Sequence, residues 1–131
     1  MKKDIQIPEV KDVHVAAIFV HNETLNSYEW NIYLLNNQPL PIETVLIVSK
    51  GNDQHIRTSV LRKQVKVVPA KSFVKIEYLH DDLLSIENKF MVSYFCEGRL
   101  YDKSFIFPAK SIDLKNTEQL PLISEKGVLA K

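Results

Sequence analysis

Glycine and cysteine are scarce in this chain, and their scarcity argues against several classes of function. The three glycines among 131 residues, Gly51, Gly98 and Gly127, lie too far apart to build a loop around a phosphate group. The single cysteine, Cys96, cannot form a disulfide within the chain, which is typical of a reducing compartment. We therefore predict neither nucleotide-dependent chemistry nor a disulfide-stapled fold, and no cofactor.

Long apolar runs and a strong net charge are missing as well. No window approaches the roughly 18 uninterrupted apolar residues of a transmembrane helix. Lys2 and Lys3 are not followed by the apolar segment of a signal peptide. The formal net charge is +1, so the charge total favours neither nucleic acid nor an anionic membrane as a partner. These absences predict a cytoplasmic protein that does not bind membranes.

Side chains that could bind a metal or act as a nucleophile are few and poorly spaced. The histidines are His14, His21, His55 and His80. No two of them, and none with Cys96, have the spacing of zinc ligands. Two aspartates follow His80, as in metal-dependent phosphohydrolases, but those enzymes take further ligands from a helical bundle. We predict no metal site and no catalytic residue; a hydrolase with a pocket around His80 and Asp81 is the least favoured alternative.

Stretches of alternating hydrophobicity cover most of the chain, and the clearest is residues 28–50. Trp30, Ile32 and Leu34 alternate with more polar residues, which is the period of a β-strand. Turn-forming residues 36–41 follow, and residues 42–48 form a second strand rich in β-branched side chains. Both strands are apolar enough to lie in a core.

Further strands are predicted at 13–21, 55–61 with a continuation at 64–68, 72–79, and in a hairpin of 90–96 and 100–107 that turns at Gly98. One short helix is predicted at 81–87. Seven to eight strands without βαβ alternation predict an all-β, antiparallel β-sandwich of immunoglobulin-like type. We expect a single domain over 1–131, with the strand core at about 13–108 and a C-terminal extension at 109–131.

Basic residues are concentrated between Arg57 and Ile76, where six occur and no acid does. Such a run is typical of a solvated sheet face whose lysines protect an edge strand. It could also contact a polyanion or a charged protein surface. The predicted contact residues are Arg57, Arg62, Lys63, Lys66, Lys71, Phe73 and Lys75.

The C-terminal segment is unexpectedly apolar. Its apolar residues include Leu120, Leu122, Ile123, Val128 and Leu129, and Pro121 and Gly127 divide it into short extended pieces. One interpretation is that the segment folds back along the sandwich as a final strand. The other is that it adds a strand to a second copy or to a partner.

Several stretches carry a resemblance that spans nearly the whole chain. They are WNIYLLNN (30–37), PIETVLIVSKG (41–51), RTSVLR (57–62), FIFP (105–108) and GVLAK (127–131). With the chain length, they resemble a family of small uncharacterised bacterial proteins, some labelled phenylalanyl-tRNA synthetase alpha subunit. The chain lacks the glycine-rich motif ending in arginine of class II synthetases, so the resemblance implies no activity and no functional residues. The order of motifs is also similar to bacterial immunoglobulin-like interaction modules.

Together these features predict a non-enzymatic protein-interaction module. Self-association, through an edge strand or the C-terminal segment, is one form of this prediction. The alternative is an RNA- or tRNA-associated accessory protein that uses the basic strand surface at 57–75.

Overall fold

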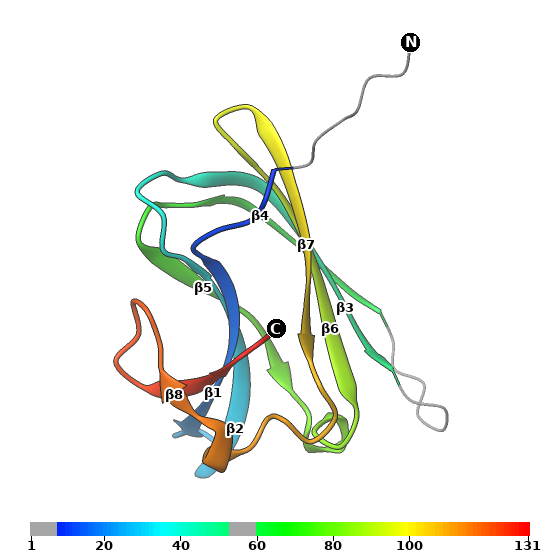
Figure 1. Ribbon diagram of the computed structural model, residues 1–131. Coiled ribbons are helices and arrows are strands. Elements are labelled where there is room, and N and C mark those ends of the chain that lie inside the picture. Colours follow the sequence, from blue (N-terminus) through cyan, green and yellow to red (C-terminus); the bar gives the residue numbers. More distant parts are fainter. Residues whose placement is uncertain (1–7, 53–59) are drawn as a thin grey trace.

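The computed structural model describes residues 8–52 and 60–131, which form two antiparallel sheets packed against each other (Figure 1). The five-stranded sheet has the strand order β5-β2-β1-β9-β8, and the four-stranded sheet has the order β4-β3-β6-β7. The strands are β1 (Val13–Asn22), β2 (Ser27–Asn36), β3 (Ile42–Asn52), β4 (Leu61–Val68), β5 (Ser72–Leu79), β6 (Glu87–Cys96), β7 (Arg99–Phe107), β8 (Glu118–Gln119) and β9 (Lys126–Leu129). The all-β sandwich is confirmed, and its immunoglobulin-like character stays a prediction.

Several elements differ from the sequence-based expectation. The described residues contain nine strands rather than seven or eight, because the C-terminal extension adds β8 and β9. The helix expected at 81–87 is one 3₁₀ turn, Asp81–Leu83, since β6 already begins at Glu87. A second 3₁₀ turn covers Leu114–Asn116. Most of the strand expected at 55–61 falls outside the described residues. Within the described ranges, no helix is long and apolar enough to cross a membrane.

Both strands expected at the centre of the fold are confirmed as strands, but they belong to different sheets. β2 pairs with β1 and β5, whereas β3 pairs with β4 and β6. Residues 37–41 therefore carry the chain from one sheet to the other and do not close a hairpin. Inward-facing side chains of both strands enter the common core, among them Trp30 and Leu34 from β2 and Ile47 from β3.

Cys96 ends β6 in the same core and is 5% exposed. Burial, and after it the nearby carboxylates of Glu97 and Glu43, raise the pKa of its thiol. A thiol that is harder to ionise is a weaker nucleophile. Cys96 therefore packs as a small apolar residue.

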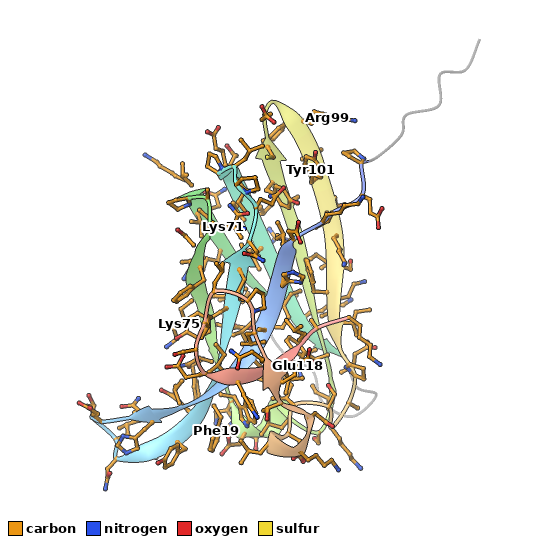
Figure 2. The ribbon with its side chains drawn as sticks, turned by 60° about the vertical axis from the view of Figure 1, so that its left-hand side comes forward. Phe19, Lys71, Lys75, Arg99, Tyr101 and Glu118 are labelled. Atoms are coloured by element: carbon orange, nitrogen blue, oxygen red, sulfur yellow. The ribbon has the colours of Figure 1, made fainter. Side chains whose placement is uncertain are left out.

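The C-terminal extension covers part of the outer face of the five-stranded sheet, over β1 and β2 (Figure 2). Leu120 and Ile123 pack against Ala16, Ile18 and Leu35, which point away from the main core. β9 pairs with β1, with Leu129 opposite Ala16. The extension thus forms a final strand within the same molecule, as one of the two interpretations expected.

Two close approaches fix this extension in place. A Cβ on Gly127 would lie 2.6 Å from the carbonyl oxygen of Ala17, so β9 can come this near to β1 only with glycine at that position. Beyond β9, the backbone N–H of Lys131 donates to the carbonyl oxygen of Ile106, and the reverse hydrogen bond is also 2.9 Å long. The segment therefore bridges from β1 in one sheet to β7 in the other.

The β6–β7 hairpin turns through two residues in the left-handed region. Glu97 has φ 49° and Gly98 has φ 76°, and Cys96 pairs with Arg99 across the turn. Positive φ at both central residues is the requirement of a type I′ turn, whose twist matches that of the flanking strands. The expected hairpin and the expected role of Gly98 are confirmed.

We predict that Gly98→Ala lowers the free energy of unfolding by about 1 kcal/mol, because a side chain disfavours this backbone conformation. No atom lies within 4 Å of the added Cβ, so the loss comes from the backbone alone. Urea unfolding measures it. Glu97→Asn is the matched control and should raise stability, since asparagine adopts positive φ more readily. Equal midpoints for wild type and Gly98→Ala would contradict the turn type.

Candidate functional site

Six of the seven predicted contact residues lie on or beside β4 and β5, and Arg57 lies outside the described residues. β4 and β5 are edge strands of different sheets. The two edges meet: Nζ of Lys63 donates to the backbone carbonyl oxygens of Lys75, at 3.0 Å, and Ile76, at 3.3 Å. Lys63 therefore binds the open edge of β5.

Lys63 points into the sandwich. In the strand register Lys63 lies opposite Ile47, whose side chain is in the core. Glu77 likewise lies opposite Ile32, which is buried, so both charged side chains point inward. Burial raises the pKa of Glu77, while a hydrogen bond from Ser49 and the charge of Lys63 act in the opposite direction. Charges that point inward at a sheet edge discourage the addition of another strand. Lys63 and Glu77 thus protect this side of the sandwich.

Lys71 and Phe73 also have partners within the chain. Nζ of Lys71 donates to the backbone carbonyl oxygen of Asn37, at 2.8 Å, and to its Oδ1, at 3.3 Å. Phe73 packs edge-on against Tyr33, with ring centroids 5.9 Å apart, on the outer face of the five-stranded sheet. Lys75 pairs with Tyr33 and shares that face; Figure 2 labels Lys71 and Lys75 on this side of the molecule.

Arg62 and Lys66 point away from the core, on the outer face of the four-stranded sheet. The structure therefore leaves Lys71 in the β4–β5 connection and divides the other described contact residues among three locations. Lys63 lies between the sheets, Phe73 and Lys75 lie on the outer face of the five-stranded sheet, and Arg62 and Lys66 lie on the outer face of the four-stranded sheet. The basic run is continuous in sequence but forms no single basic face.

The outer face of the four-stranded sheet, which we call the four-strand face, exposes apolar side chains of three strands: Leu46, Phe95 and Leu100. Its rows follow from the strand register. One row is Arg62, Val48, Met91 and Ser104, and the next is Gln64, Leu46, Ser93 and Asp102. At the end of the face, Phe95 pairs with Leu100, beside Thr44 and Lys66. Beyond the first row, Lys50 of β3 pairs with Lys89 of β6. Leu46, Val48, Met91 and Phe95 thus form an apolar centre that polar and charged side chains surround.

A β-bulge makes a hollow in this face. Between the pairs Glu43–Phe95 and Leu46–Ser93, β3 contains one residue more than β6. Thr44, in the bulge, has φ 50°, which is unfavourable for a β-branched residue. A groove of about 500 Å³ lies there, lined by Thr44, Leu46, Gln64, Lys66, Phe95 and Leu100 among others. A neighbouring hollow of about 650 Å³ shares Leu46 and Gln64 and extends to Val48 and Arg62.

His80, the histidine of the hydrolase alternative, lies at the start of the 3₁₀ turn Asp81–Leu83. Nδ1 of His80 accepts a hydrogen bond from the backbone N–H of Asp82, at 3.2 Å, and so caps the 3₁₀ turn. Both side chains are largely exposed. Among residues 8–52 and 60–131, no three histidine, cysteine or acidic side chains gather closely enough to hold a metal ion.

The sequence does contain a signal for the four-strand face. Residues 45–48 (VLIV) are apolar at both parities, so one pair of side chains enters the core and the other, Leu46 and Val48, must face outward. Phe95 lies between buried Tyr94 and Cys96 on the same strand, so its side chain also faces outward. Comparison of the chain with protein-family models, with curated protein sequences and with solved structures gives no match.

We predict that Glu77→Gln is more stable than the wild type at pH 7. The pKa of Glu77 lies above its ordinary value of 4.5, so the folded state favours the protonated carboxyl. That contribution is present below the unfolded pKa and is lost as pH rises through the folded pKa. Glutamine can keep the hydrogen bond to Ser49 without a charge.

The measurement is urea unfolding of both proteins at pH 7 and in steps down to pH 4. The difference between variant and wild type should shrink as the pH falls. A variant that is less stable at pH 7 would show that attraction by Lys63 outweighs burial.

Proposed function

We propose that this protein is a cytoplasmic, non-enzymatic protein-interaction module that binds through the four-strand face. The observation that carries the proposal is the difference between the two outer faces. The chain covers the β1–β2 part of one of them with its own C-terminal extension and leaves Phe73 and Tyr78 of β5 exposed there, whereas on the other Leu46, Phe95 and Leu100 are 37%, 40% and 53% exposed with no such cover among the described residues. Contiguous exposed apolar residues with a polar border are typical of interaction surfaces.

The composition of the four-strand face supports a protein partner. Leu46, Val48, Met91 and Phe95 lie on the two central strands, and polar side chains predominate on the bordering strands β4 and β7. An apolar centre within a polar rim is the usual arrangement of a protein interface. The side chains project from hydrogen-bonded strands, so little ordering is needed on binding.

The edges of the sandwich are less suited to binding. On the β4 side, Lys63 occupies carbonyl oxygens of β5. On the β7 side, Lys131 already pairs with Ile106. Strand addition at these points would have to displace contacts within the molecule, which favours the face over the edges.

An RNA-associated function is less well supported. The ammonium groups of Lys63 and Lys71 are held by carbonyl oxygens, and Lys75 faces away from Arg62 and Lys66. Binding to a polyanion needs several cations on one surface. Of the described residues in the basic run, Arg62 and Lys66 lie on the four-strand face, where Lys50 and Lys89 of β3 and β6 join them around an apolar centre.

We predict that Leu46→Glu and Phe95→Glu each weaken capture of the protein partner by about tenfold or more, because a charge is introduced into the apolar centre of the contact. Tagged full-length protein is used to capture partners from its own cell lysate, with and without nuclease. Leu25→Glu is the matched control, since Leu25 is 70% exposed in the β1–β2 turn, away from this face.

The expected result is a protein that survives nuclease, is retained by wild type and Leu25→Glu, and is lost with both face variants. Unfolding curves establish that all variants are folded. Equal capture by every variant, or loss of the captured material with nuclease, would contradict the proposal; the second outcome would favour the RNA-associated function.

A further inference from the structure

The two hollows of the four-strand face adjoin and form one trough along β3 and β4. The first, of about 500 Å³, includes Thr44 and Lys66, and the second, of about 650 Å³, includes Val48 and Arg62. Leu46 lines both. Thr44 and Val48 are four residues apart, which is about 13 Å along a strand. A trough of this length holds about four residues of an extended chain or about two turns of an α-helix.

The charged side chains of the trough are cations. Among its described lining residues, Arg62 and Lys66 are charged and no acid occurs. Both project from β4, four residues and thus about 13 Å apart. Lys50, two residues beyond Val48 on the same face, extends this basic border past the end of the trough, and Lys89 lies opposite it on β6. Complementary charge at an interface therefore requires an anionic ligand on this side of the trough.

The acids of the four-strand face lie outside the trough, at the margins of the sheet. Asp102 is on β7, the border opposite β4. Glu43 pairs with Phe95 at one end of the face, and Glu87 pairs with Asn52 at the other end. The charge of the face is therefore uneven, with cations beside the apolar hollows and acids away from them.

The lining of the trough is mostly apolar and largely aliphatic. Phe95 is the single aromatic side chain among its described lining residues, whereas single-stranded nucleic acid stacks its bases on several aromatic side chains. A fatty acid has one carboxylate, which can reach only one of two cations about 13 Å apart. A polypeptide can bring apolar side chains and two carboxylates to the trough together.

From these features, and resting on the proposed function, we infer that the partner presents an acidic segment with apolar side chains to the four-strand face. Its apolar side chains enter the trough beside Leu46 and Phe95, and two of its carboxylates lie over Arg62 and Lys66. Carboxylates about 13 Å apart are about four residues apart in an extended segment and about nine apart in a helix. The charge pairs lie at the rim and set the orientation of the segment, while the apolar contacts supply most of the affinity.

Selection from a phage-displayed library of random peptides on the immobilised full-length protein tests this inference. Peptides of about 12 residues cover the trough either as a helix of about 18 Å or as an extended chain of about 40 Å. Enriched peptides should contain aspartate or glutamate together with leucine, isoleucine or phenylalanine. As labelled synthetic peptides, they are then titrated with protein from about 1 to 500 µM, a range that brackets a micromolar dissociation constant.

The double variant Arg62→Glu with Lys66→Glu should bind these peptides about tenfold or more weakly than the wild type, because both carboxylates then meet like charges. Leu46→Glu should weaken binding by a similar factor. Lys75→Glu, on the outer face of the other sheet, is the matched control and should leave binding unchanged. The decisive measurement exchanges the charges: a peptide whose acids are replaced by lysine should bind the double variant more tightly than it binds the wild type.

Enriched peptides without acids, the absence of any enriched peptide, or equal binding to the wild type and the double variant would overturn the inference. Binding of a labelled oligouridine in place of the peptides would also overturn it, in favour of RNA. Capture from lysate separates this failure from that of the proposed function. A protein that is lost with Leu46→Glu but retained by the double variant would leave the proposed function standing with a partner that is not acidic, whereas a protein retained by both would contradict the two together.

Discussion

The fully buried side chain of Asn36 ties together the connections that join the two sheets. Its Nδ2 donates to the carbonyl oxygens of Leu40, Val68 and Pro69, at 2.9, 3.1 and 3.0 Å, and its Oδ1 accepts the N–H of Gln38. A buried amide without these partners would be costly, so the partners must stay in place. The ends of β2 and β4 and the start of β3 are thereby held together. The position of β3, and with it the four-strand face, depends on this group.

Much of the fold was predictable from alternation in the sequence, because the period of a strand is a local property. Residues 72–79 and 90–107 show that period, residues 13–21 are apolar at both parities, and the strands predicted from them are confirmed. The assignment of β2 and β3 to different sheets was not predictable in this way. The turn residues between them are equally compatible with a hairpin, and the choice is made by distant groups such as the carbonyl of Val68 that binds Asn36.

The candidate site was harder to predict, since it depends on how strands combine. The basic run from 57 to 75 suggested one surface, but alternation and the change of sheet send Lys63, Lys66 and Lys75 in three directions. Leu46 and Val48 could have been recognised as outward-facing from the apolar run they share. The groove could not, because it requires Thr44 at a φ that threonine rarely adopts.

The pairing of β1 with β9 has a consequence for synthesis in the cell. β1 is made early, yet its second edge has no native partner until residues 126–129 have left the ribosome. Until residues 120–123 have been made, Ala16 and Ile18 also lack the cover that Leu120 and Ile123 provide. An open strand edge beside uncovered apolar side chains favours wrong pairing between nascent chains. Residues 120–129 therefore protect β1 from such pairing once they have folded onto it.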